Sequence, residues 1–159
     1  MHGTIFILSE KEIPVDTLFE RVLEQAREFY YDSFDYVRKM KNRESEDEML
    51  RFLKEAEKYA YVEGKRLSFS VRKLRDYCER KYDRPDCLKF SYSFHYCFES
   101  WVNMNKRALD PAILIDRNGI IFMGYCLLDA LQWYLDCDGR RDIDEVYSFY
   151  LAGVLDYHF

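Results

Sequence analysis

Histidine and cysteine side chains that could do chemistry come close together in the sequence only at His95 and Cys97. Two residues apart on a strand, both side chains would leave the same face, and a thiolate beside an imidazole is a nucleophile with its base. The sequence places no acidic or amide group to orient the pair, and a lone cysteine is more often a packing residue. A zinc site that added Cys87 would lack a fourth ligand and the usual spacing. We therefore expect neither a catalytic pair nor a zinc site here.

The segment from Asp136 to Glu145 has carboxylates at the spacing of a calcium-binding loop. With Gly139 at the glycine position of that loop, four carboxylates fall on ligand positions: Asp136, Asp138, Asp142 and Glu145. Tyr134 then occupies the first ligand position and Arg141 the eighth, and neither suits the loop. An acidic turn in which Asp142 or Asp144 caps a following helix explains the same residues without an ion. No metal ion or other cofactor is therefore predicted.

Known catalytic motifs are missing from the sequence. It has no glycine-rich phosphate loop, no Gly-x-Ser-x-Gly turn and no His-Glu-x-x-His pair. Its five cysteines are irregularly spaced, and none of them forms a pair with the two-residue gap of a redox or metal motif. No basic leader precedes the apolar run Ile5–Leu8, and no apolar stretch approaches the ~20 residues that cross a bilayer. We expect no catalytic residues, no membrane partner, and a cytoplasmic protein with free thiols.

Five carboxylates follow one another at strict four-residue spacing and form what we call the acidic ridge: Asp16, Glu20, Glu24, Glu28 and Asp32. On a helix they would drift across the face opposite the apolar residues, about 6 Å apart along the axis. Like charges at this spacing oppose the helix by on the order of 1–2 kcal/mol in total. One explanation is a solvated face with Arg21 and Arg27 as local partners. The other is a surface that binds a basic partner.

Basic residues gather in the middle of the chain. Residues 1–37 have a net charge of −5, residues 38–84 of +5 and residues 85–159 of −5. A candidate nucleic-acid-binding face consists of five residues on one side of a predicted third helix and of Arg72 nearby: Arg72, Lys73, Tyr77, Arg80, Lys81 and Arg84. A basic helix after another helix and a turn is typical of a helix-turn-helix reader. Interleaved acids such as Asp76 and Glu79, and a pI of about 5.3, disfavour binding to a polyanion.

Leu88 and five aromatic residues occupy every second position from 88 to 98, which is the strongest strand pattern in the sequence. Ser, His, Cys and Lys residues fill the alternate positions. An exposed aromatic face could stack the bases of a single strand. The polar alternate positions favour the other interpretation, in which the aromatic face is buried in the core.

Hydrophobic periodicity predicts the elements that would carry these residues. We expect a strand over 4–8 and a long helix over 15–41. A capping box formed by Ser45 and Glu48 would open a second helix that ends near Gly64, so that the two helices form a hairpin. A short strand over 66–70 would follow, with Ser70 capping the third helix.

In the C-terminal part of the chain, residues 112–123 have the pattern of a β-hairpin. Asn118-Gly119 lies between two apolar runs and suits a two-residue type I′ turn. Helices are expected over 126–136 and 143–157, with Asp138-Gly139 between them.

The predicted fold class is α+β, with an N-terminal helical hairpin and further helices packed on a small, largely antiparallel sheet. A chain of 159 residues favours one compact domain spanning residues 1–159. We expect a non-enzymatic protein whose acidic ridge binds a basic protein surface by electrostatic steering. Its specific form would be an inhibitor or decoy that occludes a basic site on a nucleic-acid-handling protein. The alternative is a nucleic-acid-binding regulator that uses the basic helix 71–84.

Overall fold

The computed structural model describes residues 2–12, 15–70, 72–74, 76–77, 110–137 and 145–158. Three sets of residues from the sequence analysis lie outside these ranges. They are the aromatic segment 88–98 with His95, Cys97 and the nearby Cys87, the central part of the acidic loop at 138–144, and the basic residues Arg80, Lys81 and Arg84.

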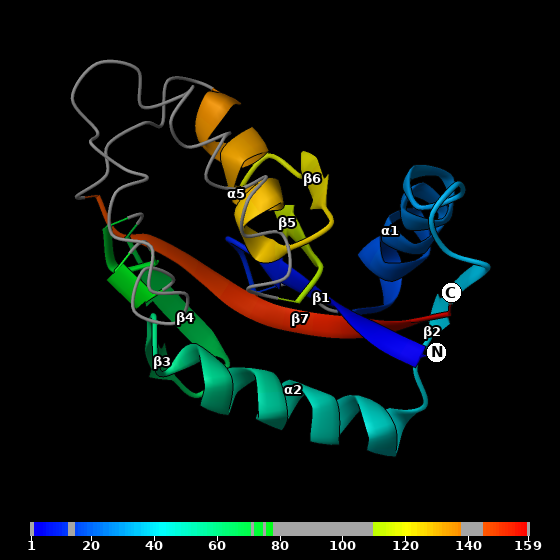
Figure 1. Cartoon of the computed structure of the whole chain (residues 1–159), viewed down its shortest axis with the longest axis horizontal. Coiled ribbons are helices and arrows are strands. Elements are labelled where there is room, and N and C mark those ends of the chain that lie inside the picture. The colour runs from blue at the N-terminus through cyan, green and yellow to red at the C-terminus, as the bar shows by residue number, and fades with distance from the viewer. Residues whose placement is uncertain are drawn as a thin grey trace.

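A seven-stranded sheet runs through the molecule in the order β3-β4-β7-β1-β5-β6, and β2 also pairs with β7 (Figure 1). The strands are β1 (His2–Ser9), β2 (Tyr36–Lys39), β3 (Tyr61–Glu63), β4 (Arg66–Phe69), β5 (Ala112–Ile115), β6 (Ile121–Gly124) and β7 (Tyr147–His158). β1 and β5 are parallel, whereas the other pairs are antiparallel. The sheet is therefore mixed, and the long strand β7 lies at its centre.

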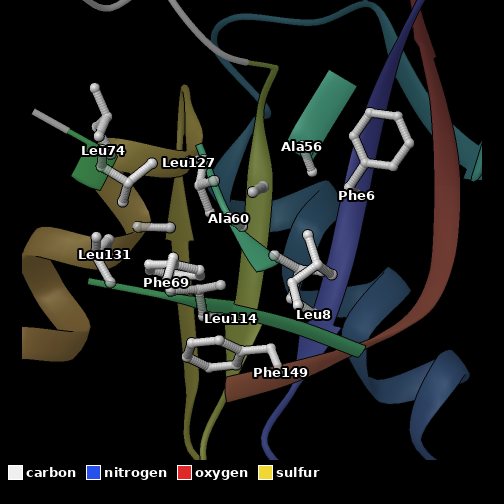
Figure 2. Packing of buried hydrophobic residues seen from close by; sticks show 14 of the residues in the cluster. Phe6, Leu8, Ala56, Ala60, Phe69, Leu74, Leu114, Leu127, Leu131 and Phe149 are labelled. Atoms are coloured by element: carbon white, nitrogen blue, oxygen red, sulfur yellow. The ribbon is translucent and has the colours of Figure 1, made fainter. Parts of the chain in front are cut away.

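Helices cover both faces of this sheet. Helix α1 (Val15–Phe29) packs against Ile5, Ile7 and Ile113. Helices α2 (Asn42–Ala56) and α5 (Leu127–Asp136) pack on the opposite face. There Phe6 and Leu8 of β1 and Leu114 of β5 lie close to Ala56, Leu127 and Leu131 (Figure 2). Because successive residues of a strand point to opposite faces, the apolar runs of β1 and β5 are buried on both sides.

The predicted N-terminal helical hairpin is wrong. Helix α1 ends at Phe29, and residues 36–39 form β2, which pairs with residues 155–158 of β7. Helix α2 begins at Asn42 rather than at Ser45, and its N-cap residue Lys41 makes no side-chain cap bond, so the predicted capping box is wrong as well. Helices α1 and α2 are therefore separated by a strand and lie on opposite faces of a mixed seven-stranded sheet. This arrangement replaces the predicted helical hairpin on a small, largely antiparallel sheet.

The predicted helix over 143–157 is also wrong, because residues 147–158 form β7. Ile7 pairs with Gly153 but Leu8 pairs with Leu151, so Ala152 is an extra residue in a β-bulge. The bulge exchanges the two faces of the strand. Phe149 and Leu151 face the α2–α5 side, as does Val154, whereas Leu155 faces α1.

Several shorter elements are confirmed. Strand β4 and helix α5 lie within one residue of the predicted ranges, and Ser70 caps the following helical turn through a bond from the Lys73 N–H to its Oγ, 3.1 Å long. β5 and β6 form the predicted hairpin. Its turn differs, because the Gly119 N–H donates to the Asp116 carbonyl, which centres the turn on Arg117 and Asn118. Gly119 follows at φ +80°, a conformation that favours glycine.

None of the helices in the described part of the chain is long and apolar enough to cross a membrane.

Candidate protein-binding surface

Helix α1 positions the acidic ridge. Its apolar side chains recur at three- and four-residue intervals and are buried against the sheet, namely Phe19, Val22, Leu23 and Ala26. This spacing fixes one face of the helix inward. Glu20, Glu24 and Glu28 are therefore on the outer face, and all three are exposed.

Among the described residues, no basic neighbour neutralises the ridge carboxylates on the helix. Within the described ranges, Glu20, Glu24 and Glu28 form no ion pair. The Arg27 guanidinium turns away and donates through Nε to the Val37 carbonyl, 3.0 Å away, which ties α1 to β2. Local arginine partners therefore do not account for the row of acids.

The two ends of the predicted ridge differ from its centre. Asp32 is exposed but lies in the turn after α1 rather than on the helix. The backbone of Asp16 is in the first turn of α1, and its side chain is outside the described part of the structure. The ridge on the helix thus consists of Glu20, Glu24 and Glu28, with Asp32 close to the C-terminal end of the helix in sequence.

An exposed aromatic group lies beside the C-terminal end of α1. The rings of Phe29 and Tyr125 are 5.5 Å apart between centroids, and the Tyr125 hydroxyl is 3.0 Å from Ser33 Oγ. Trp133 of α5 is 59% exposed. Partly exposed Tyr and Trp residues are the types that most often anchor protein interfaces.

A hollow of about 330 Å³ joins Glu28 of the ridge to Phe29 and Trp133. Its lining comes from α1, β6 and α5: Gln25, Glu28, Phe29, Ile121, Met123 and Trp133. The same surface therefore combines carboxylates with apolar and aromatic groups. Sequence reasoning found the acids by their spacing but missed the hollow, because its lining residues are up to 108 positions apart (Gln25 and Trp133).

Buried contacts hold the walls of this hollow in place. The Tyr30 hydroxyl donates to the Gly124 carbonyl, which ties the end of α1 to β6, and burial raises the pKa of Tyr30 far above its ordinary value. A Cβ on Gly124 would overlap the backbone nitrogen of Ala130. Glycine at this position therefore lets α5 begin directly against β6.

The described part of the basic face makes internal contacts. The Lys73 ammonium lies over the Tyr61 ring, 3.5 Å from its centroid. Tyr77 is buried, and its hydroxyl donates to Glu55 Oε1 at 2.9 Å. Arg72 is exposed. Two of the three described members of this face thus pack within the protein rather than forming a groove.

A second cluster lies where the ends of β1, β2 and β7 meet, and sequence reasoning missed it. Asp156 is 7% exposed and accepts hydrogen bonds from Arg38 Nε at 2.8 Å and His2 Nδ1 at 3.2 Å. These three residues line a hollow of about 720 Å³. Arg51 and Asp110, whose side chains are 3.4 Å apart, line it as well. Burial raises the pKa of Asp110, and Arg51 partly opposes that rise. Most of these charges pair with one another across strands.

A third hollow, of about 530 Å³, lies beyond the carboxyl end of β1. The Glu10 carboxylate accepts hydrogen bonds from the Tyr134 hydroxyl and from the Arg117 backbone N–H at 2.8 Å. Its oxygens are thus already engaged by the protein. Within the described residues, no group of three His, Cys, Asp or Glu side chains could hold a metal ion.

Comparisons of the chain with protein-family models, with curated proteins and with solved structures found no match.

Proposed function

We propose that this chain is a non-enzymatic binding protein whose acidic ridge contacts a basic surface on a protein partner. The observation that carries the proposal is the state of Glu20, Glu24 and Glu28. All three are exposed on the outer face of α1, and none has a basic partner within the described ranges.

Repulsion along the ridge is what a basic partner would relieve. Like charges four residues apart on a helix cost a few tenths of a kcal/mol per pair, so the free protein holds this surface at an energetic disadvantage. A basic partner would remove the repulsion on binding. The acidic row would also speed the encounter of the two proteins, because long-range attraction mainly raises the association rate.

The aromatic residues next to the ridge supply what charges alone do not. Pairs of exposed charges contribute little net affinity, whereas buried Trp and Tyr side chains are typical interface anchors. Trp133 and Tyr125 lie close to the acidic end of the same surface. A partner that meets both parts would be steered by the carboxylates and held by the aromatic rings.

In the specific form of this proposal, the occluded basic site is one that a partner protein uses to bind nucleic acid. Carboxylates spaced by about 6 Å along a helix would occupy positions that phosphates occupy otherwise. The protein would then act as a cytoplasmic inhibitor or decoy.

Charge reversal tests the proposal. A tagged triple variant, Glu20→Lys with Glu24→Lys and Glu28→Lys, is used to capture proteins from the native host for mass spectrometry. The matched control reverses Glu46, Glu57 and Glu63, which are exposed on α2, the turn after it, and β3. We expect basic proteins to be captured by the wild type and the control but lost by the ridge variant. Equal recovery by all three proteins contradicts the proposal.

A further inference from the structure

The outer edge of β6 has no strand paired to it in the described part of the chain, where β6 pairs with β5 alone. The Asp116 N–H donates to the Ile120 carbonyl at 3.0 Å, so these two residues are a hydrogen-bonded pair of the hairpin. Residues of an antiparallel pair alternate between bonded and non-bonded positions. The backbone N–H and C=O groups of Ile121 and Met123 therefore point away from β5.

This edge opens onto the 330 Å³ hollow. Ile121 and Met123 line it, Glu28 and Phe29 line it from α1, and Trp133 lines it from α5. Because α1 and α5 lie on opposite faces of the sheet, the hollow is bounded by a helix on each side of the strand edge. An added strand would lie about 4.8 Å from β6, between those helices.

Short length is the only protective feature within β6. Natural edge strands are blunted by short length, lysine, proline or a bulge, and the four-residue sequence Ile-Phe-Met-Gly of β6 contains no charge and no proline. An edge of this kind is a template for β-strand addition.

We propose that an extended segment of the basic partner adds to the outer edge of β6 as a further strand. Its alternate side chains would be basic toward α1, where Glu28 lines the hollow, and apolar toward Trp133. This alternation follows from the two faces of a strand and from the different chemistry of the two helices that flank the edge. The inference rests on the proposed function, because the acidic ridge is what makes the segment basic.

A peptide with alternating lysine and valine, Lys-Val-Lys-Val-Lys-Val with blocked ends, is the probe. Two N-methylated versions remove the backbone donors, one at the lysines and the other at the valines. Alternate N–H groups of a strand point to opposite edges, so only one of the two sets faces β6. We expect one methylated peptide to lose at least tenfold in affinity and the other to bind like the parent, measured by fluorescence anisotropy. An equal effect of the two methylations, large or small, overturns the inference.

The β6 backbone offers a matched pair of variants. Ile121→Pro removes the outward N–H at the first residue of an edge strand, where proline is tolerated, and Ile121→Ala keeps it. The alanine variant should bind the peptide at least fivefold more tightly than the proline variant, with both shown to be folded by thermal unfolding. Hydrogen exchange adds a check that needs no variant. The Met123 amide should exchange freely in the protein alone and slow down when the peptide binds, and protection in the protein alone contradicts the inference.

The possible failures can be told apart. If ridge reversal abolishes peptide binding but both methylated peptides bind alike, the acidic surface is functional and strand addition is wrong. If an alternating glutamate–valine peptide binds as well as the lysine peptide, the basic partner itself is wrong. A concentration-dependent dimer that Ile121→Pro abolishes would show that a second copy of the chain occupies the edge, and this too would overturn the inference.

Discussion

Two charged regions of the molecule differ in how their charges are satisfied. At the ends of β1, β2 and β7, the buried Asp156 carboxylate is held by Arg38 and His2 from neighbouring strands. On α1, Glu20, Glu24 and Glu28 have no such partners in the described structure. Paired and buried charges fix strands relative to one another, whereas exposed and unpaired charges are available to another molecule. We therefore expect the first region to contribute to stability, and the second is the surface for which we propose a binding role.

The largest difference between the regions should appear when one carboxylate is removed from each. Asp156→Ala deletes the acceptor of two hydrogen bonds from ionisable side chains and is expected to lower the free energy of unfolding by about 1–3 kcal/mol. Glu24→Ala should change it by no more than about 0.5 kcal/mol. Urea unfolding measures both, and equal losses would break the comparison.

Removal of the Tyr30 hydroxyl tests whether its hydrogen bond to β6 fixes the walls of the 330 Å³ hollow. Tyr30→Phe keeps the ring packing but leaves the Gly124 carbonyl without this buried donor. We expect a loss of about 1–2 kcal/mol in the free energy of unfolding, together with faster hydrogen exchange in β6. Unchanged exchange in β6 would mean that other contacts fix the walls of the hollow.

Substitution of Lys73 distinguishes the proposed protein-binding function from the alternative, nucleic-acid-binding function. Because its ammonium lies over the Tyr61 ring, Lys73→Gln should reduce stability by about 0.5–1 kcal/mol. The same variant should leave capture of the basic partner unchanged. A salt-sensitive gel shift with nucleic acid that this substitution weakens would instead favour the alternative function.

The smallest expected effect is a pH dependence at Asp110. Burial raises the pKa of this carboxyl in the folded protein above its ordinary value, so the folded state binds the proton more tightly than the unfolded chain does. Asp110 therefore makes stability fall as the pH rises from the ordinary carboxyl pKa through the raised one. Asp110→Asn should remove this fall, so that unfolding curves of variant and wild type converge in acid and separate toward pH 7 in favour of the variant. If Asp110→Asn instead loses more stability at pH 7 than in acid, the pKa of Asp110 is not raised in the folded protein.

The sequence predicted local features of the ridge better than long-range ones. The positions of Glu20, Glu24 and Glu28 follow from helical spacing alone. Ser70 predicts the helical turn after it, because an N-cap side chain bonds to the backbone of the next few residues. The hollow beside the ridge could not be found in this way. It depends on β6 and α5 reaching α1, and neither turn chemistry nor periodicity specifies that approach.

The errors in the predicted fold have the same origin. Val37 and Met40 continue the helical spacing of α1, and the residues between contain no glycine or proline, so only pairing with β7 shows that Tyr36–Lys39 is a strand. In β7, the buried residues 147, 149 and 151 follow a two-residue period, but the extra residue Ala152 moves the next ones to 154 and 155. Positions 147, 151, 154 and 155 therefore also fit the spacing of a helix. In both cases tertiary pairing overrides the local pattern.

The central place of β7 has a consequence for how the chain folds as it is synthesised. β7 pairs with β1, β2 and β4, all of which leave the ribosome before it, and one of its partnerships joins His2 to His158. Contacts this distant in sequence slow folding. Until Tyr147–His158 emerges, β1-β5-β6 and β3-β4 can form only as separate groups, and the edges that β7 will cover stay open to aggregation. Completion of this sheet therefore waits until β7 has been made.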